Sequence, residues 1–130
     1  MRFVVYPEDG VLALWDAAPF AHIEDYDAWE AEMADPRGHV ESGALVLFPV
    51  EDERECVVDV RVGGDALGEP VAGPYLFVAT TEVLLCPPSG VGGVLWDHTA
   101  ELDIPAGRYT VTVHRDGGTV VLVLRELGGE

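Results

Sequence analysis

Short apolar segments separated by turn-forming residues recur along most of this chain. In the segment 56–62, cysteine and valine occupy every second position, and Asp59 and Arg61 lie between them. This period of two is typical of a β-strand that buries one face. The segment 108–115 alternates in the same way, and its pattern predicts that His114 points outward.

Turn signals follow one another at intervals of about 8–12 residues, which is the spacing expected of short antiparallel strands. We expect about eight or nine strands, in the segments 3–6, 11–15, 44–50, 56–62, 75–80, 82–86, 94–104, 108–115 and 119–127. This pattern predicts an all-β fold, an antiparallel sandwich or jelly-roll-like domain. A chain of 130 residues is expected to form a single domain, residues 1–130.

Three turn sequences are predicted to join neighbouring strands into hairpins, because they combine glycine with proline or aspartate. They are the segments 7–10, 105–107 and 116–118. Each would pair the strand before it with the strand after it. The second of these hairpins would bring His98 and His114 close together on adjacent strands.

One segment, 25–34, carries apolar residues at helical rather than strand spacing. Tyr26, Trp29 and Met33 would form a single stripe along a helix, and Asp25 can cap its first turn. The Asp-Pro-Arg-Gly sequence that follows is predicted to end the helix. We therefore expect one short amphipathic helix packed on a sheet, with an acidic, solvated face.

The charge of the chain is strongly negative and unevenly distributed. It has 24 Asp and Glu against seven basic residues, all of them Arg, which gives a formal net charge of −17. Residues 1–70 hold 17 of the acids and four of the Arg. At 48% hydrophobic residues the chain is apolar enough to fold despite this charge. An acidic surface repels nucleic acid and anionic membranes and attracts basic proteins.

Several other classes of function have little support in the sequence. No apolar stretch approaches the roughly 18 residues of a membrane span, and we expect a soluble, cytoplasmic protein without a signal peptide. Cys56 and Cys86 lie in apolar segments without a CxxC spacing, so both are predicted to be buried, inert thiols. No nucleophile motif is present, and we expect neither enzymatic activity nor a cofactor.

One alternative gives the chain a small-molecule or metal site. Asp97, His98 and His114 would come together if the hairpin around 105–107 forms. Two imidazoles and a carboxylate can bind a metal ion or transfer protons. The competing interpretation is that these are ordinary surface residues on a polar sheet face.

The segment 102–111, Leu-Asp-Ile-Pro-Ala-Gly-Arg-Tyr-Thr-Val, follows apolar strands at 44–48 and 75–86 and precedes a closing strand. This arrangement, over residues 40–127, resembles the competence protein J family of small, acidic, β-rich nuclease inhibitors. The resemblance implies a non-enzymatic protein that blocks a DNA-degrading enzyme. The helix at 25–34 and the loop at 87–93 depart from that family, and no inhibitory residues can be transferred from it.

The charge and the resemblance together predict an inhibitor or immunity-type protein that binds a basic partner, most plausibly a nuclease. Carboxylates can take the place of phosphates in a nuclease groove. The residues predicted to bind the partner are Glu24, Asp27, Trp29, Glu32, Glu51, Asp52, Glu53 and Glu55. A further alternative is a structural or oligomerisation module whose acidity reflects an acidic proteome.

Overall fold

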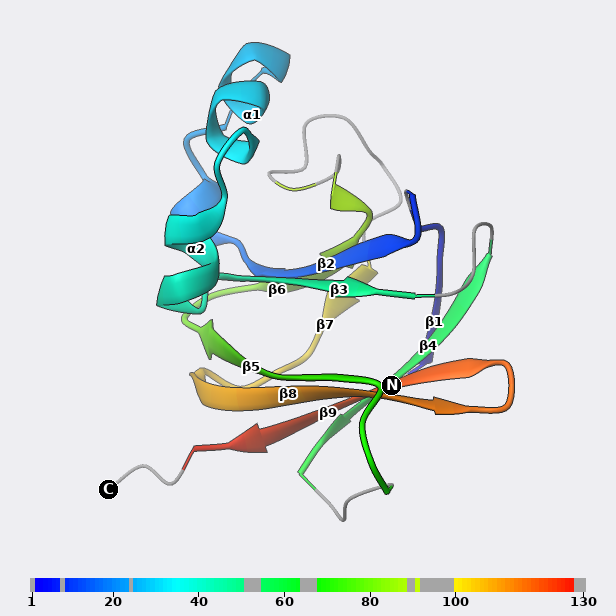
Figure 1. Ribbon diagram of the computed structural model, residues 1–130. Helices are drawn as coiled ribbons and strands as arrows, with labels where there is room; N and C mark the ends of the chain where they lie inside the picture. Colours follow the sequence, from blue (N-terminus) through cyan, green and yellow to red (C-terminus); the bar gives the residue numbers. More distant parts are fainter. Residues whose placement is uncertain are drawn as a thin grey trace.

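Two β-sheets pack face to face in the computed structural model (Figure 1), which describes residues 2–7, 9–23, 25–50, 55–63, 68–88, 91 and 100–127. The five-stranded sheet has the order β1 (Arg2–Val5), β4 (Cys56–Val62), β9 (Thr119–Glu126), β8 (Gly107–Asp116) and β5 (Ala72–Ala79). The four-stranded sheet has the order β3 (Leu45–Pro49), β2 (Val11–Asp16), β6 (Val83–Cys86) and β7 (Ala100–Leu102). The predicted all-β sandwich is therefore confirmed.

The main hydrophobic core lies between the two sheets and follows from the alternation of each strand. Leu12, Leu14 and Phe48 from the four-stranded sheet are fully buried in this core. Val111 and Leu122 are buried with them from the five-stranded sheet. Burying one such side chain stabilises a fold by about 1.5–3 kcal/mol. This core can hold the sandwich together without help from a metal or disulfide.

Two turns join different strands from those predicted. Strand β1 pairs with β4 and β2 with β3 and β6, so the turn at 7–10 carries the chain from one sheet to the other. Strand β7 pairs with β6, whereas β8 pairs with β5 and β9. A turn sequence marks a change of direction but does not determine which sheet the next strand joins. The hairpin around 116–118 is confirmed, and β4 pairs with β9 in parallel, unlike the antiparallel pairs of the other described strands.

Short helical segments cover the outer face of the four-stranded sheet: η1 (Ala18–Phe20), α1 (Tyr26–Met33) and α2 (Arg37–Ser42). Helix α1 is the predicted one, and Asp25 caps it as expected by accepting a 2.8 Å hydrogen bond from the Ala28 N–H. Helix α2 was not predicted, because an Asp-Pro-Arg-Gly sequence usually ends a helix. Here Pro36 starts a new helix, where proline needs no N–H partner, and Gly43 ends it at a φ of 86°.

A second hydrophobic cluster joins these helices to the sheet. Trp15 and Phe20 are its largest buried side chains, and their rings meet edge to face with centroids 5.6 Å apart. Cys86 belongs to this cluster and Cys56 to the main core, so the prediction that both thiols are buried is confirmed. Within the described ranges, no helix is long and apolar enough to cross a membrane.

Candidate functional site

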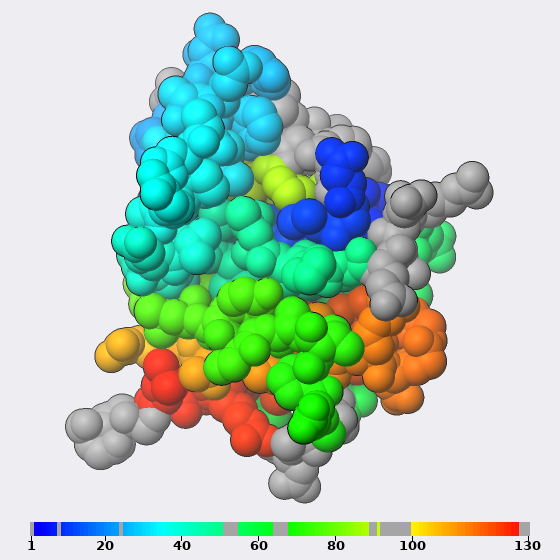
Figure 2. All heavy atoms as spheres, in the orientation of Figure 1, coloured from blue at the N-terminus to red at the C-terminus, as the bar shows by residue number. Residues whose placement is uncertain are grey.

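Helix α1 carries three of the predicted partner-binding residues, Asp27, Trp29 and Glu32. It projects at one end of the molecule, above the four-stranded sheet (Figures 1 and 2). Asp27 is exposed in its first turn, whereas Trp29 and Glu32 are partly buried. The Trp29 ring packs on the second hydrophobic cluster, and its indole N–H donates a 3.3 Å hydrogen bond to the Pro88 carbonyl. Trp29 therefore attaches α1 to the end of β6.

Other predicted residues are far from α1 or outside the described parts of the chain. Glu55 is exposed and directly precedes β4, so it borders the five-stranded sheet rather than the helices. Outside the described residues lie Glu24, Glu51, Asp52, Glu53, Asp97 and His98. The predicted surface is thus placed only at Asp27, Trp29, Glu32 and Glu55, and these four residues are divided between the two sheets.

Glu32 links three parts of the helical region through its carboxylate. His22, which follows η1, contacts Glu32 Oε2 through Nε2 at 3.1 Å, and His39 of α2 contacts Oε1 through Nε2. The hydrogen bond with His39, followed by that with His22, lowers the pKa of the Glu32 carboxyl below its usual value. The His39 ring also packs on Phe20, with centroids 4.5 Å apart. Glu32 therefore positions α1 in addition to contributing charge.

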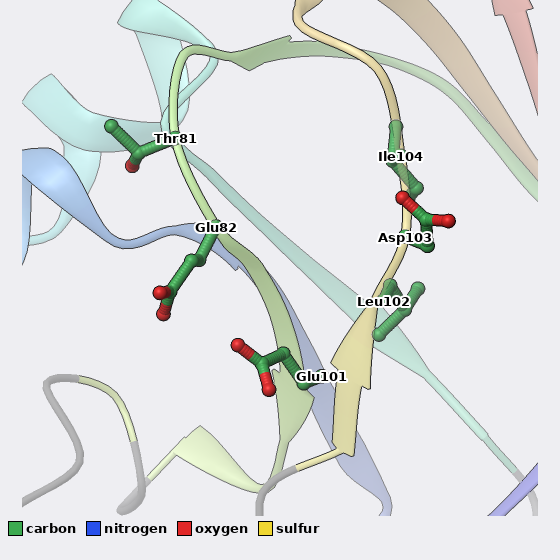
Figure 3. Close-up of a pocket in the computed structure, with 6 residues that line it drawn as sticks. All are labelled: Thr81, Glu82, Glu101, Leu102, Asp103 and Ile104. Atoms are coloured by element: carbon green, nitrogen blue, oxygen red, sulfur yellow. The ribbon is translucent and has the colours of Figure 1, made fainter.

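An acidic cleft lies where strands β6 and β7 meet the segments next to them, and its volume is about 430 Å³ (Figure 3). It is lined by Thr81, Glu82, Glu101, Leu102, Asp103 and Ile104. The carboxyl-bearing residues are exposed, whereas Leu102 and Ile104 are buried beneath them. Figure 3 shows the side chains of Glu82 and Glu101 directed to the same side from adjacent segments, whereas that of Asp103 points the other way. The cleft is thus lined by three acidic residues, two of which extend to one side.

Glu101 of the acidic cleft lies on the same face of the four-stranded sheet as the helices. Glu101 is directly opposite Leu84 in the pairing of β6 with β7, and opposite residues in antiparallel strands share a face. Leu84 packs on the cluster that also contacts Trp29, whereas its neighbours Val83 and Leu85 face the main core. We call this surface the helix-bearing face: helices η1, α1 and α2 together with the acidic cleft.

Sequence reasoning missed the acidic cleft because carboxylates are abundant along the whole chain. Glu82, Glu101 and Asp103 are separated by polar and apolar residues alike, without a motif spacing. Only the pairing of β6 with β7 brings Glu82 to Glu101 and Asp103, and the sequence predicted a different partner for the second strand. The available signal was an acidic residue directly before the apolar segment of β6, Glu82, and another directly after β7, Asp103.

The pairing predicted to bring His114 beside the segment of Asp97 and His98 is not the one observed, since β8 pairs with β5 and β9; Asp97 and His98 lie outside the described residues. The His114 side chain is on the outer face of β8, as the alternation predicted, but it is only 4% exposed rather than on the surface. Its Nε2 lies 2.8 Å from the Thr112 hydroxyl oxygen. The segment that follows β4 covers this face, since Gly68 and Pro70 line a hollow together with His114. In the part of the chain that the structure describes, no three His, Cys, Asp or Glu residues are grouped as metal ligands.

Comparison with known proteins gives similarity of fold without similarity of sequence. No family profile matches the chain, and no significant match is found among curated proteins. Two solved structures share the fold over nearly the whole chain. The first is ComJ from Bacillus subtilis, described as an inhibitor of the DNA-degrading activity of NucA. Its TM-score is 0.61 at 10% identity, with 98% of this chain and 96% of ComJ covered.

The second structure is described as crocagin biosynthetic gene J, with a TM-score of 0.60 at 14% identity and coverage of 97% of this chain and 98% of that one. Identities this low establish a common fold only. The predicted resemblance to the competence protein J family is therefore confirmed at the level of the fold. The match also includes the helical region, because it extends beyond residues 40–127 to nearly the whole chain.

Proposed function

We propose that this chain is a non-enzymatic inhibitor that binds a basic protein, and that the partner is a nuclease. The observation that carries the proposal is a net charge of −17 on a fold that matches the nuclease inhibitor ComJ over 98% of this chain. A nuclease needs a basic groove to hold the phosphate backbone. A protein that presents carboxylates to that groove competes with DNA and associates rapidly through long-range attraction.

The helix-bearing face offers a suitable binding surface. Helix α1 contributes Asp27 and Glu30 on a projecting element, and the acidic cleft contributes Glu82, Glu101 and Asp103 in a hollow. A projection and a hollow of the same charge, attached to the same sheet, can receive several basic side chains at once. These carboxylates are hydrated in the free protein, so the cost of removing their water falls on binding, where ion pairs with the partner offset it.

Affinity capture tests this proposal. The purified protein, immobilised at low ionic strength, is exposed to an extract of the source organism, and retained proteins are eluted with salt and identified by mass spectrometry. The eluate is then assayed for DNA degradation with and without added free protein. We expect a basic nuclease whose activity the free protein suppresses. An eluate without basic proteins, or with a nuclease that the protein leaves fully active, contradicts the proposal.

A further inference from the structure

Helix α1 carries two aromatic rings that contact each other, and only one of them packs against a hydrophobic cluster. Trp29 is partly buried against the second hydrophobic cluster, whereas Tyr26, one turn earlier, is 50% exposed. The two rings lie 5.6 Å apart between centroids, inclined by 33°. One face of Tyr26 is thus supported by Trp29, and the remainder of the ring is open to solvent.

The inner ring of this pair is held in place by a polar contact, the hydrogen bond from the Trp29 indole to the Pro88 carbonyl. Glu30 acts on the outer ring, since hydrogen bonding with its side chain and then its charge raise the pKa of the Tyr26 phenol. A ring that rests on a fixed neighbour loses less conformational freedom when another group stacks on it.

Two carboxylates lie near the exposed ring. Glu30 lies one helical turn after Tyr26, on the same side of α1, and Asp27 follows Tyr26 directly. Both are exposed. An open aromatic face bordered by carboxylates is complementary to a cation that is flat and carries several donors. The guanidinium group of arginine has this form, since it stacks on aromatic rings and pairs with carboxylates through two parallel hydrogen bonds.

We infer that Tyr26 and Glu30, supported by Trp29, form a receptor for an arginine side chain of the basic partner. This inference rests on the proposed function and adds the residue type that α1 recognises. The guanidinium stacks on the exposed Tyr26 ring, and its N–H groups donate to the Glu30 carboxylate. Lysine fits less well, because its compact ammonium is strongly hydrated and cannot stack or donate through a planar fork.

The test compares two labelled peptides of equal length, one of alternating arginine and glycine and one of alternating lysine and glycine. Binding is measured by fluorescence anisotropy at several salt concentrations. We expect the native protein to bind the arginine peptide about three- to tenfold more tightly than the lysine peptide. Tyr26→Leu should abolish this preference and leave the affinity for the lysine peptide unchanged. Tyr26→Phe should retain most of the preference, because the ring remains.

Tyr6 provides a matched control, since it is an exposed tyrosine (52%) that follows β1, away from α1. Tyr6→Leu should leave the arginine preference intact. Equal binding of the two peptides by the native protein overturns the inference, and so does an equal loss of preference in Tyr6→Leu and Tyr26→Leu. If Tyr26→Leu inhibits a captured nuclease as strongly as the native protein, the arginine receptor is wrong while the proposed function stands.

Discussion

Asp16 and Thr81 form a double contact at the edge of the core. Oδ1 of Asp16 accepts hydrogen bonds from both the backbone N–H and the hydroxyl of Thr81, at 3.0 and 3.1 Å. Thr80 donates through its own N–H and hydroxyl to the same carboxylate. Asp16 is only 1% exposed, so these four bonds replace the water that its charge would otherwise hold. The contact ties the end of β2 to the turn between β5 and β6.

Replacing this carboxylate should destabilise the fold strongly. Asp16→Ala leaves four partly buried donors without an acceptor, and we expect a loss of about 2–3 kcal/mol in the free energy of unfolding. Urea unfolding followed by tryptophan fluorescence measures the change. Asp103→Asn, which alters an exposed aspartate, should change stability by less than about 0.5 kcal/mol. Similar stabilities for the two variants would show that the Asp16 contacts contribute little.

The Glu32 contacts predict a specific dependence of stability on pH. Because His39 and His22 lower the pKa of Glu32 in the folded state, the unfolded chain binds a proton at this position more readily. The stabilisation is therefore complete above the unfolded pKa of about 4.3 and is lost as the pH falls through the lowered folded value. Glu32→Gln should cost about 1 kcal/mol at neutral pH, since the carboxylate is partly exposed.

Urea midpoints measured from neutral to acid pH for the native protein and Glu32→Gln test this expectation. The difference between the two should shrink as the pH falls below about 4.3. Glu41→Gln, at an exposed glutamate on α2, controls for the loss of one negative charge. A difference that stays constant at acid pH, or that Glu41→Gln reproduces, contradicts the assignment.

Replacement by alanine should change stability in opposite directions at Gly38, which lies within α2, and at Gly43, which ends it. Gly43 has a φ of 86°, and a Cβ there would lie 2.8 Å from Val78 Cγ2. Gly43→Ala should therefore destabilise the protein by more than about 1 kcal/mol. Gly38 is helical, and a Cβ at this position would meet no described atom within 4 Å, so Gly38→Ala should stabilise by about 0.5 kcal/mol. Thermal unfolding distinguishes the two, and equal effects would contradict the proposed end of α2.

The sequence allowed the class of fold and helix α1 to be predicted because both depend on local patterns. The alternation in β4 and the Asp25 cap are determined by neighbouring residues. Strand partners depend instead on contacts distant in sequence, such as Leu84 beside Glu101. For this reason the pairings of β1 and β7 were predicted wrongly, and the acidic cleft was not predicted.

The candidate site was only partly predictable for a related reason. A surplus of acidic residues indicates the charge of the partner, but it cannot show which carboxylates lie together. Asp16 illustrates the difficulty, since its sequence context resembles that of exposed acids, yet Thr80 and Thr81 from another strand turn bury it. His114 was predicted to be exposed because the chain that covers its face lies elsewhere in the sequence.

The central claim, that the helix-bearing face inhibits a basic nuclease, is tested most directly by two charge-matched variants. One replaces the acidic cleft, Glu82→Gln/Glu101→Gln/Asp103→Asn. The other changes three exposed acids beside or within the five-stranded sheet, Glu69→Gln/Asp116→Asn/Glu126→Gln. Each removes three negative charges, so general attraction falls equally in both.

The measurement is the inhibition constant of each protein against the captured nuclease over a range of salt concentrations. We predict that inhibition by the native protein weakens steeply with salt. The variant of the acidic cleft should be weaker by about tenfold or more, and the control by only a few-fold. Equal losses in the two variants, or inhibition that does not depend on salt, would contradict the claim.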